Sequence, residues 1–123
     1  VLDKKEFDKW GKLGLEKSKD YIQQINKLLN KKNIDFTLVY LEEPIFMLNS
    51  VNSDFYKNFW DNIALTNNFD FIFVSDFHKN EKDKFKIYKD LFFIGDNHFN
   101  DKGNEVVAKE IMKKSNYLQN VIN

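Results

Sequence analysis

Cysteine and arginine are both absent from the 123-residue chain, and each absence excludes a kind of function. Without cysteine there are no disulfide bonds, no Cys-based zinc site and no thiol nucleophile. All 19 basic residues are lysines, and 19 acidic residues balance them, so the formal net charge is zero. Nucleic-acid binding usually needs a net basic face and favours the planar guanidinium group of arginine. We therefore expect no nucleic-acid partner.

The chain also lacks a long apolar run, internal repeats and a low-complexity linker. The apolar run at 91–94 is far too short to cross a bilayer, so we expect no membrane span in this chain. No signal peptide is visible, and the first residue is valine, so the sequence can be a segment of a longer protein. The length suits one domain with its own core, and we treat 1–123 as a single domain. Composition fixes neither the compartment nor the oligomeric state.

Apolar residues at helical spacing predict three helices. The first covers 16–30 and the second covers 54–66, with Ser53 as a plausible cap. The third begins at Asn100 or Asp101. Its residues expected to face the core are Val106, Val107, Ile111 and Met112.

Uncharged stretches rich in aromatic and β-branched residues predict strands at 36–40 and 71–74, and a short third strand or extended piece at 91–95. The charged segment 79–90 is expected to be a surface excursion. Alternating helices and strands predict an α/β fold, a three-layer flavodoxin-like parallel sheet with flanking helices. In such sheets, sites lie beyond the carboxyl ends of the strands.

The stretch "GDNHFNDKGN" places an acid two residues before a histidine. In extended backbone, residues two apart point to the same side, so the side chains of Asp96 and His98 can touch. A carboxylate that accepts from one ring nitrogen fixes the tautomer and supports the charge when the other nitrogen takes a proton. This chemistry predicts a catalytic base, His98, with Asp96 as its orienter; the alternative is a polar turn before the helix.

The longer stretch "FFIGDNHFNDKGNEVVAKEI" resembles the last conserved block of the SGNH, or GDSL, hydrolase superfamily. It is most similar to the branch related to alginate O-acetyltransferases, where Asp-x-His-Trp-Asn-x-x-Gly precedes a helix. The resemblance implies that Asp96 and His98 are the acid and base of a catalytic triad. The other matching positions are Phe99 in place of the tryptophan, Asn100 and Gly103 in the turn, and Ala108 in the helix.

Two departures from the superfamily bear on function. Most members space the acid and histidine as Asp-x-x-His, and the Gly-Asp-Ser nucleophile block and the Gly-x-Asn-Asp block do not occur in this chain. Both blocks precede the matching region in the family. The resemblance therefore implies the C-terminal part of a longer serine-dependent O-acyl esterase or O-acetyltransferase. This part would supply the His/Asp pair and be inactive alone, because it has no visible nucleophile. No cofactor is expected.

The family implies a small ester or an O-acetylated carbohydrate as substrate, and a periplasmic or extracellular location. The serines of the chain do not lie in a glycine-flanked nucleophile elbow. They are more simply explained as loop hydroxyls and helix caps: Ser18, Ser50, Ser53, Ser75 and Ser115.

Other functions remain open at this stage. One is a non-catalytic interaction or carbohydrate-binding module that keeps the fold without the chemistry. Another is a divalent metal site, because two Asp-x-His pairs together offer carboxylate and imidazole ligands. We expect no metal, however, since lysines follow the first pair. Glu42 and Glu43 are interpreted as a solvated strand end, and Trp10 and Trp60 as buried aromatics on helices. The ligands of the metal alternative would be Asp76, His78, Asp96 and His98.

Overall fold

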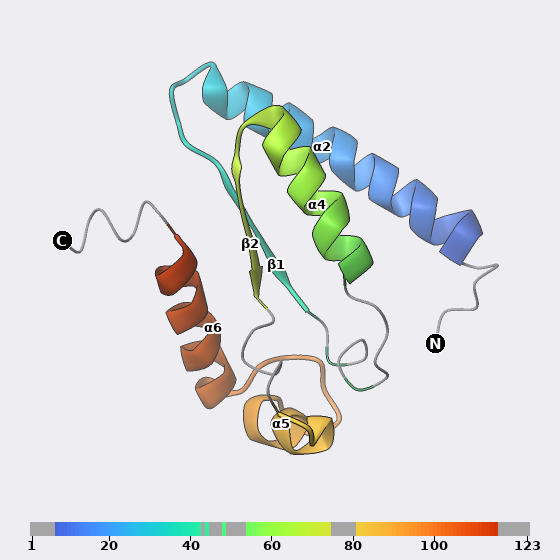
Figure 1. Cartoon of the computed structure of the whole chain (residues 1–123), viewed down its shortest axis with the longest axis vertical. Coiled ribbons are helices and arrows are strands. Elements are labelled where there is room, and N and C mark those ends of the chain that lie inside the picture. The colour runs from blue at the N-terminus through green and yellow to red at the C-terminus, as the bar shows by residue number, and fades with distance from the viewer. Residues whose placement is uncertain (1–6, 43, 45–47, 49–53, 75–80, 116–123) are drawn as a thin grey trace.

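The computed structural model describes residues 7–42, 44, 48, 54–74 and 81–115. Helices lie on both sides of a small sheet, and both strands run toward the end of the molecule that holds the helix of residues 84–91 (Figure 1). The elements in chain order are η1 (Phe7–Gly11, a π-helical turn), α2 (Lys12–Asn30), β1 (Thr37–Leu41), α4 (Asp54–Asn67), β2 (Asp70–Val74), α5 (Lys84–Leu91) and α6 (Asp101–Lys114).

The sheet consists of β1 and β2, which pair in parallel. Thr37 lies opposite Asp70 and Leu41 opposite Val74, and the amide of Asp70 donates to the carbonyl of Phe36 at 3.1 Å. Each strand lies within one residue of its predicted position. The prediction of two parallel strands joined through a helix is confirmed.

One face of the sheet packs against α4. The ring of Tyr40 in β1 stacks on Phe73 in β2, with 5.4 Å between centroids, and on Tyr56 of α4, with 6.1 Å. Trp60 and Ile63 of α4 are buried. Burying an apolar side chain of this size contributes about 1.5–3 kcal/mol to stability, so this face anchors α4 firmly.

The opposite face packs against α6. Ile72 and Val74 of β2 form a core cluster with Val107 of α6, and Val39 and Phe99 pack against that cluster. The domain is therefore mixed α/β with helices on both faces of a parallel sheet, as predicted at this coarser level. Among the described residues, no helix is both long and apolar enough to cross a membrane.

Helix α2 begins at Lys12, earlier than the predicted residue 16, and runs through Gly14. It packs on α4 through amide side chains rather than through an apolar seam alone. The buried Asn26 donates from Nδ2 to the carbonyl of Asn67 at 2.8 Å, and Gln23 donates from Nε2 to Oδ1 of Asn67 at 3.1 Å.

Most of the described part of 79–90 lies at the surface, as predicted, but it forms a helix that packs on the core. Residues Lys84–Leu91 form α5, and Oδ1 of Asp83 caps it by accepting from the amide of Lys86 at 3.0 Å. Ile87 and Leu91 are four residues apart, so they share one face of the helix and are buried together with Phe92. The lysines occupy the other faces of the helix. The charge pattern alone therefore does not predict this short apolar stripe.

Of the two alternatives for 91–95, a third strand is absent from the described residues, and extended backbone is found at Phe92. Leu91 ends α5, and Phe92 makes only an isolated antiparallel bridge with Phe99. Beyond it the chain turns, because the amide of Asp96 donates to the carbonyl of Phe93 at 3.0 Å and Gly95 has a positive φ of 83°. That conformation suits glycine and ends extended structure.

The last helix begins as predicted, with Asn100 as its cap and Asp101 as its first residue. Val107 is buried and Ile111 half-buried, but Met112 is 47% exposed, so its predicted place in the core is wrong. The prediction that Trp10 is buried is also wrong, because Trp10 is 59% exposed on η1. Trp60 is buried as predicted.

Candidate functional site

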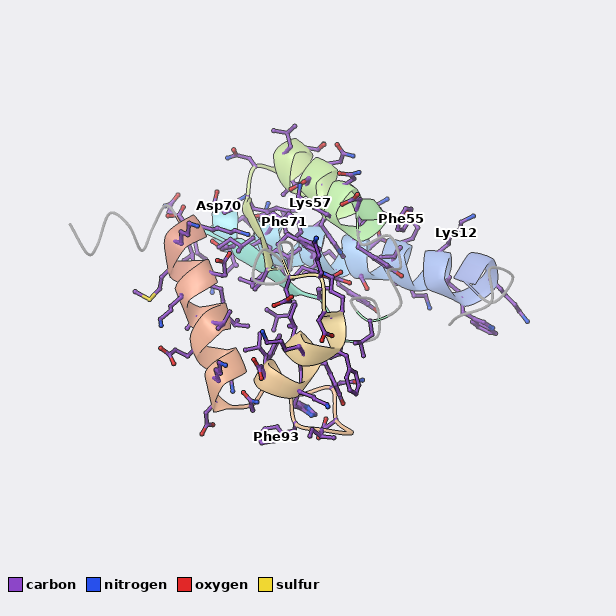
Figure 2. All side chains as sticks on the ribbon, turned by 60° about the horizontal axis from the view of Figure 1, so that its bottom comes forward. Lys12, Phe55, Lys57, Asp70, Phe71 and Phe93 are labelled. Atoms are coloured by element: carbon purple, nitrogen blue, oxygen red, sulfur yellow. The ribbon has the colours of Figure 1, made fainter. Side chains whose placement is uncertain are left out.

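The Asp-x-His motif lies in the loop 92–100, which joins α5 to α6. Figure 1 shows α5 beyond the ends toward which both strand arrows point. Figure 2 places Phe93, on the loop, far from Asp70 and Phe71 at the start of β2. The loop therefore lies toward the carboxyl end of the parallel strands, where open α/β sheets hold their sites.

A tyrosine from α5 shapes the turn that precedes the motif. The hydroxyl of Tyr88 accepts from the amide of Gly95 at 2.8 Å and lies 3.3 Å from the carbonyl of Asp96, to which it can donate. The amide of Phe93 in turn donates to the carbonyl of His98 at 3.0 Å, which closes the loop. Backbone and hydroxyl together hold residues 93–98 in one conformation.

The end of the loop is fixed by Asn100. Its Oδ1 accepts from the amide of Gly103 at 2.9 Å, as an N-cap, while its Nδ2 donates to the carbonyl of Asp90 at 3.0 Å. The amide of Asn100 also donates to the carbonyl of Leu91 at 2.9 Å. One residue thus ties the first turn of α6 to the last turn of α5.

Gly103 allows α5 and α6 to approach closely. A Cβ atom at this position would lie 2.1 Å from the carbonyl oxygen of Leu91 and 2.7 Å from Cδ1 of Phe99. Phe99 itself stacks on Phe92 with 4.3 Å between ring centroids. The turn that follows the motif is therefore packed without room for a side chain at residue 103.

The side chains of Asp96 and His98 are in contact. Oδ1 of Asp96 lies 2.5 Å from Nδ1 of His98 and also accepts from the amide of His98 at 3.1 Å. An ionised carboxylate has no proton to donate, so Nδ1 carries the proton and Nε2 is the nitrogen left to accept one. The hydrogen bonds found among the described residues do not involve Nε2.

The pair is open to solvent, with the side chain of His98 83% exposed and that of Asp96 52% exposed. The hydrogen bond from the His98 side chain, followed by the one from the His98 amide, lowers the pKa of Asp96 below its usual range. The carboxylate therefore stays ionised throughout the neutral range and remains able to orient the imidazole.

The described serines are not placed at this pair. Ser18 is exposed on α2, and Ser115 is buried just beyond the far end of α6. A helix of 14 residues is about 21 Å long, which separates Ser115 from the loop. Ser50, Ser53 and Ser75 lie outside the described residues.

The metal alternative receives no additional ligand from the described part of the chain. Asp76 and His78 lie outside the described residues. Over the described ranges, no group of three or more histidine, aspartate or glutamate side chains is placed to hold an ion. Within these ranges the carboxylate–imidazole pair of Asp96 and His98 stands by itself.

Glu42 corrects another expectation. It directly follows β1 and was predicted to be solvated, yet it is only 4% exposed and takes part in interactions in the fold. Glu43 lies outside the described residues. Sequence reasoning also missed Tyr88, because it lies in the lysine-rich segment. The available signal was its spacing of four residues from Phe92, the first residue after the helix, on which the Tyr88 ring stacks.

Two surface grooves lie away from the loop. One, of about 710 Å³, is lined by α2 and the end of α4, including Gln23 and Asn67. The other, of about 1040 Å³, runs along the start of the strands and includes Phe36, Val39 and Ile111. Neither groove is lined by the Asp-x-His pair, so the site chemistry lies outside both of them.

Comparison of the chain with protein-family models, with curated proteins and with solved structures found no match.

Proposed function

We propose that this chain is the C-terminal part of a serine-dependent, SGNH-type O-acyl esterase or O-acetyltransferase. In this proposal His98 is the general base and Asp96 its orienter, and the serine belongs to polypeptide outside this chain. The parallel strands β1 and β2 belong to a larger three-layer, flavodoxin-like sheet. The substrate class is a small ester or an O-acetylated carbohydrate.

The observation that carries the proposal is the geometry of the Asp96–His98 pair. The carboxylate holds Nδ1 at 2.5 Å, which leaves Nε2 as the basic nitrogen facing outward. Capping by Asn100 and the close packing at Gly103 fix the backbone around it. A base that is oriented by a carboxylate is the arrangement that nucleophilic acyl transfer requires.

The chemistry proceeds in two steps. The serine oxygen attacks the ester carbonyl while its proton passes to Nε2 of His98, and that proton then goes to the departing alcohol. Water or a sugar hydroxyl next gives its proton to Nε2 and attacks the acyl-serine. Nε2 then returns that proton to the serine oxygen as the acid or the new ester departs, which regenerates the serine. Asp96 stabilises the imidazolium in both steps.

The test uses the protein encoded by the complete reading frame, with p-nitrophenyl acetate as the ester. We expect His98→Gln to lower kcat by roughly 10²–10⁴-fold, the usual contribution of a general base. Asp96→Asn should lower it as well, because the amide can present its N–H to Nδ1 and favour the wrong tautomer.

Asp101→Asn is the matched control, since Asp101 lies five residues away, exposed in the first turn of α6. It should leave kcat unchanged. Turnover by the His98→Gln protein equal to that of the wild type would contradict the proposal. Absence of esterase and acetyltransferase activity from the complete protein would favour a non-catalytic module instead.

A further inference from the structure

The two edges of the sheet are treated differently. The amide of Asp70 donates toward β1, so alternate residues of β2 face β1 and Phe73 faces outward. Nζ of Lys114 donates to the carbonyl of Phe73 at 2.8 Å, and Glu110 lies beside it at 3.4 Å. A charged side chain at the edge of a sheet hinders further pairing, so Lys114 of α6 guards the edge of β2 at Phe73.

Within the described ranges, the outer edge of β1 has no such guard. Because Phe36 accepts from Asp70, the alternating pattern turns the backbone groups of Thr37, Val39 and Leu41 away from β2. Among the described residues, no hydrogen-bond partner is found for these outward groups. The strand reads TLVYL and contains no charge, proline or bulge of the kind that normally protects an exposed edge.

The positions of the helices indicate which strand belongs at this edge. Figure 1 shows α2 and α4 on one side of the sheet and α6 on the other. Connections between parallel strands are almost always right-handed. Since α4 links β1 to β2 on this side, a strand that leads through α2 into β1 must lie on the side of β1 away from β2.

Uncovered apolar surface supports the same position. The outer face of η1 and α2 exposes large apolar side chains, and a helix needs a second layer to cover such a stripe. The groove of about 1040 Å³ at the start of the strands includes Ile34 and Val39, together with residues of β2 and of both flanking helices. The exposed residues of η1 and α2 are Trp10, Leu13, Tyr21, Ile25 and Leu28.

We propose that the outer edge of β1 accepts one further strand, parallel to β1, from polypeptide that precedes α2 in the same protein. This inference rests on the proposed function in one respect, namely that more of the protein precedes this chain. It adds the place where the two parts of the protein join, namely the junction between the outer edge of β1 and the added strand. The added strand would end at the same edge of the sheet as β1 and β2, on the side of the Asp96–His98 loop.

Amide hydrogen exchange tests the junction directly. In the 123-residue chain, the outward amides of Val39 and Leu41 should exchange at least about tenfold faster than the inward amides of Leu38 and Tyr40, because only the latter pair with β2. In the protein from the complete reading frame, both sets should be slow, and NOE contacts should show a parallel neighbour.

A proline substitution provides a second readout. Leu41→Pro removes an outward N–H, whereas Leu41→Ala also removes the leucine side chain beyond Cβ but keeps that N–H. In the complete protein, Leu41→Pro should melt at a lower temperature than Leu41→Ala. In the 123-residue chain, the two variants should melt together.

Three results would overturn the inference: outward amides that stay fast in the complete protein, an antiparallel neighbour, or a reading frame with no strand before α2. Protection that appears in the 123-residue chain as its concentration rises would instead assign the edge to a second copy. The catalytic proposal fails separately, because loss of the Nε2 base by His98→Gln changes turnover without changing amide protection at β1.

Discussion

At the scale of single residues, Gly103 carries the strictest requirement in the described structure. Its missing side chain lets the carbonyl of Leu91 and the ring of Phe99 close against the first turn of α6. We expect Gly103→Ala to lower the free energy of unfolding by about 1–3 kcal/mol, because the backbone of α5 must move to admit the methyl group. Chemical denaturation measures this change.

Gly14→Ala is the matched control for Gly103→Ala. A Cβ atom at Gly14 meets nothing within 4 Å, and the residue lies inside α2. The substitution should stabilise the protein by up to about 1 kcal/mol through helix propensity. Equal effects of the two substitutions would show that close packing at Gly103 is not what selects glycine there.

Asp96 provides a prediction about pH. The hydrogen bond from the His98 side chain is the largest cause of its lowered pKa, and the His98 amide is the next. His98→Gln removes the ring donor but keeps the amide, so the pKa of Asp96 should rise while staying below its ordinary value. The pKa of Asp96 can be measured in both proteins from its carboxyl ¹³C chemical shift over a pH titration.

The sign of the stability effect follows from the direction of that shift. Because the folded pKa of Asp96 lies below the unfolded one, its contribution is present above the unfolded pKa and is lost as the pH falls through the folded value. The contribution should be smaller in His98→Gln. An identical Asp96 titration in both proteins would contradict a hydrogen bond between the two side chains.

At the scale of elements, the structure shows that α5 contributes to the stability of the fold through its buried face. We expect Ile87→Ala to cost about 2–5 kcal/mol, because Ile87 is buried against Leu91 and Phe92. Phe85→Ala, on the exposed side of the same helix, should cost far less. Comparable costs from thermal or denaturant unfolding would mean that α5 does not pack on this face.

The elements also show where sequence reasoning succeeds. The strands at 37–41 and 70–74 and the helix after Asn100 were predictable, because apolar periodicity and a side-chain cap are local signals. Helix α5 was not, because a single pair of buried residues four apart is weak against five lysines between residues 79 and 90. The strand expected at 91–95 does not form, because Leu91 is the last residue of α5 and is buried from that helix.

At the scale of the whole molecule, the parallel pairing and the helices on both faces follow from alternation in the sequence. The contact between Asp96 and His98 was predictable from their spacing of two. Its support was not, because Tyr88 and the Asp90 and Leu91 carbonyls reach the loop from a helix that the charge pattern concealed. The burial of Glu42 likewise depends on tertiary packing that no local pattern encodes.

The proposed division of the catalytic groups makes one measurement decisive. The protein from the complete reading frame is treated with a fluorophosphonate, which forms a covalent bond with an activated serine, and the labelled residue is identified by mass spectrometry. We predict a label on a serine outside residues 1–123, formed roughly 10²–10⁴-fold more slowly in His98→Gln. A label within residues 1–123, a rate that is unchanged by His98→Gln, or no label at all would contradict the role proposed for the Asp96–His98 pair.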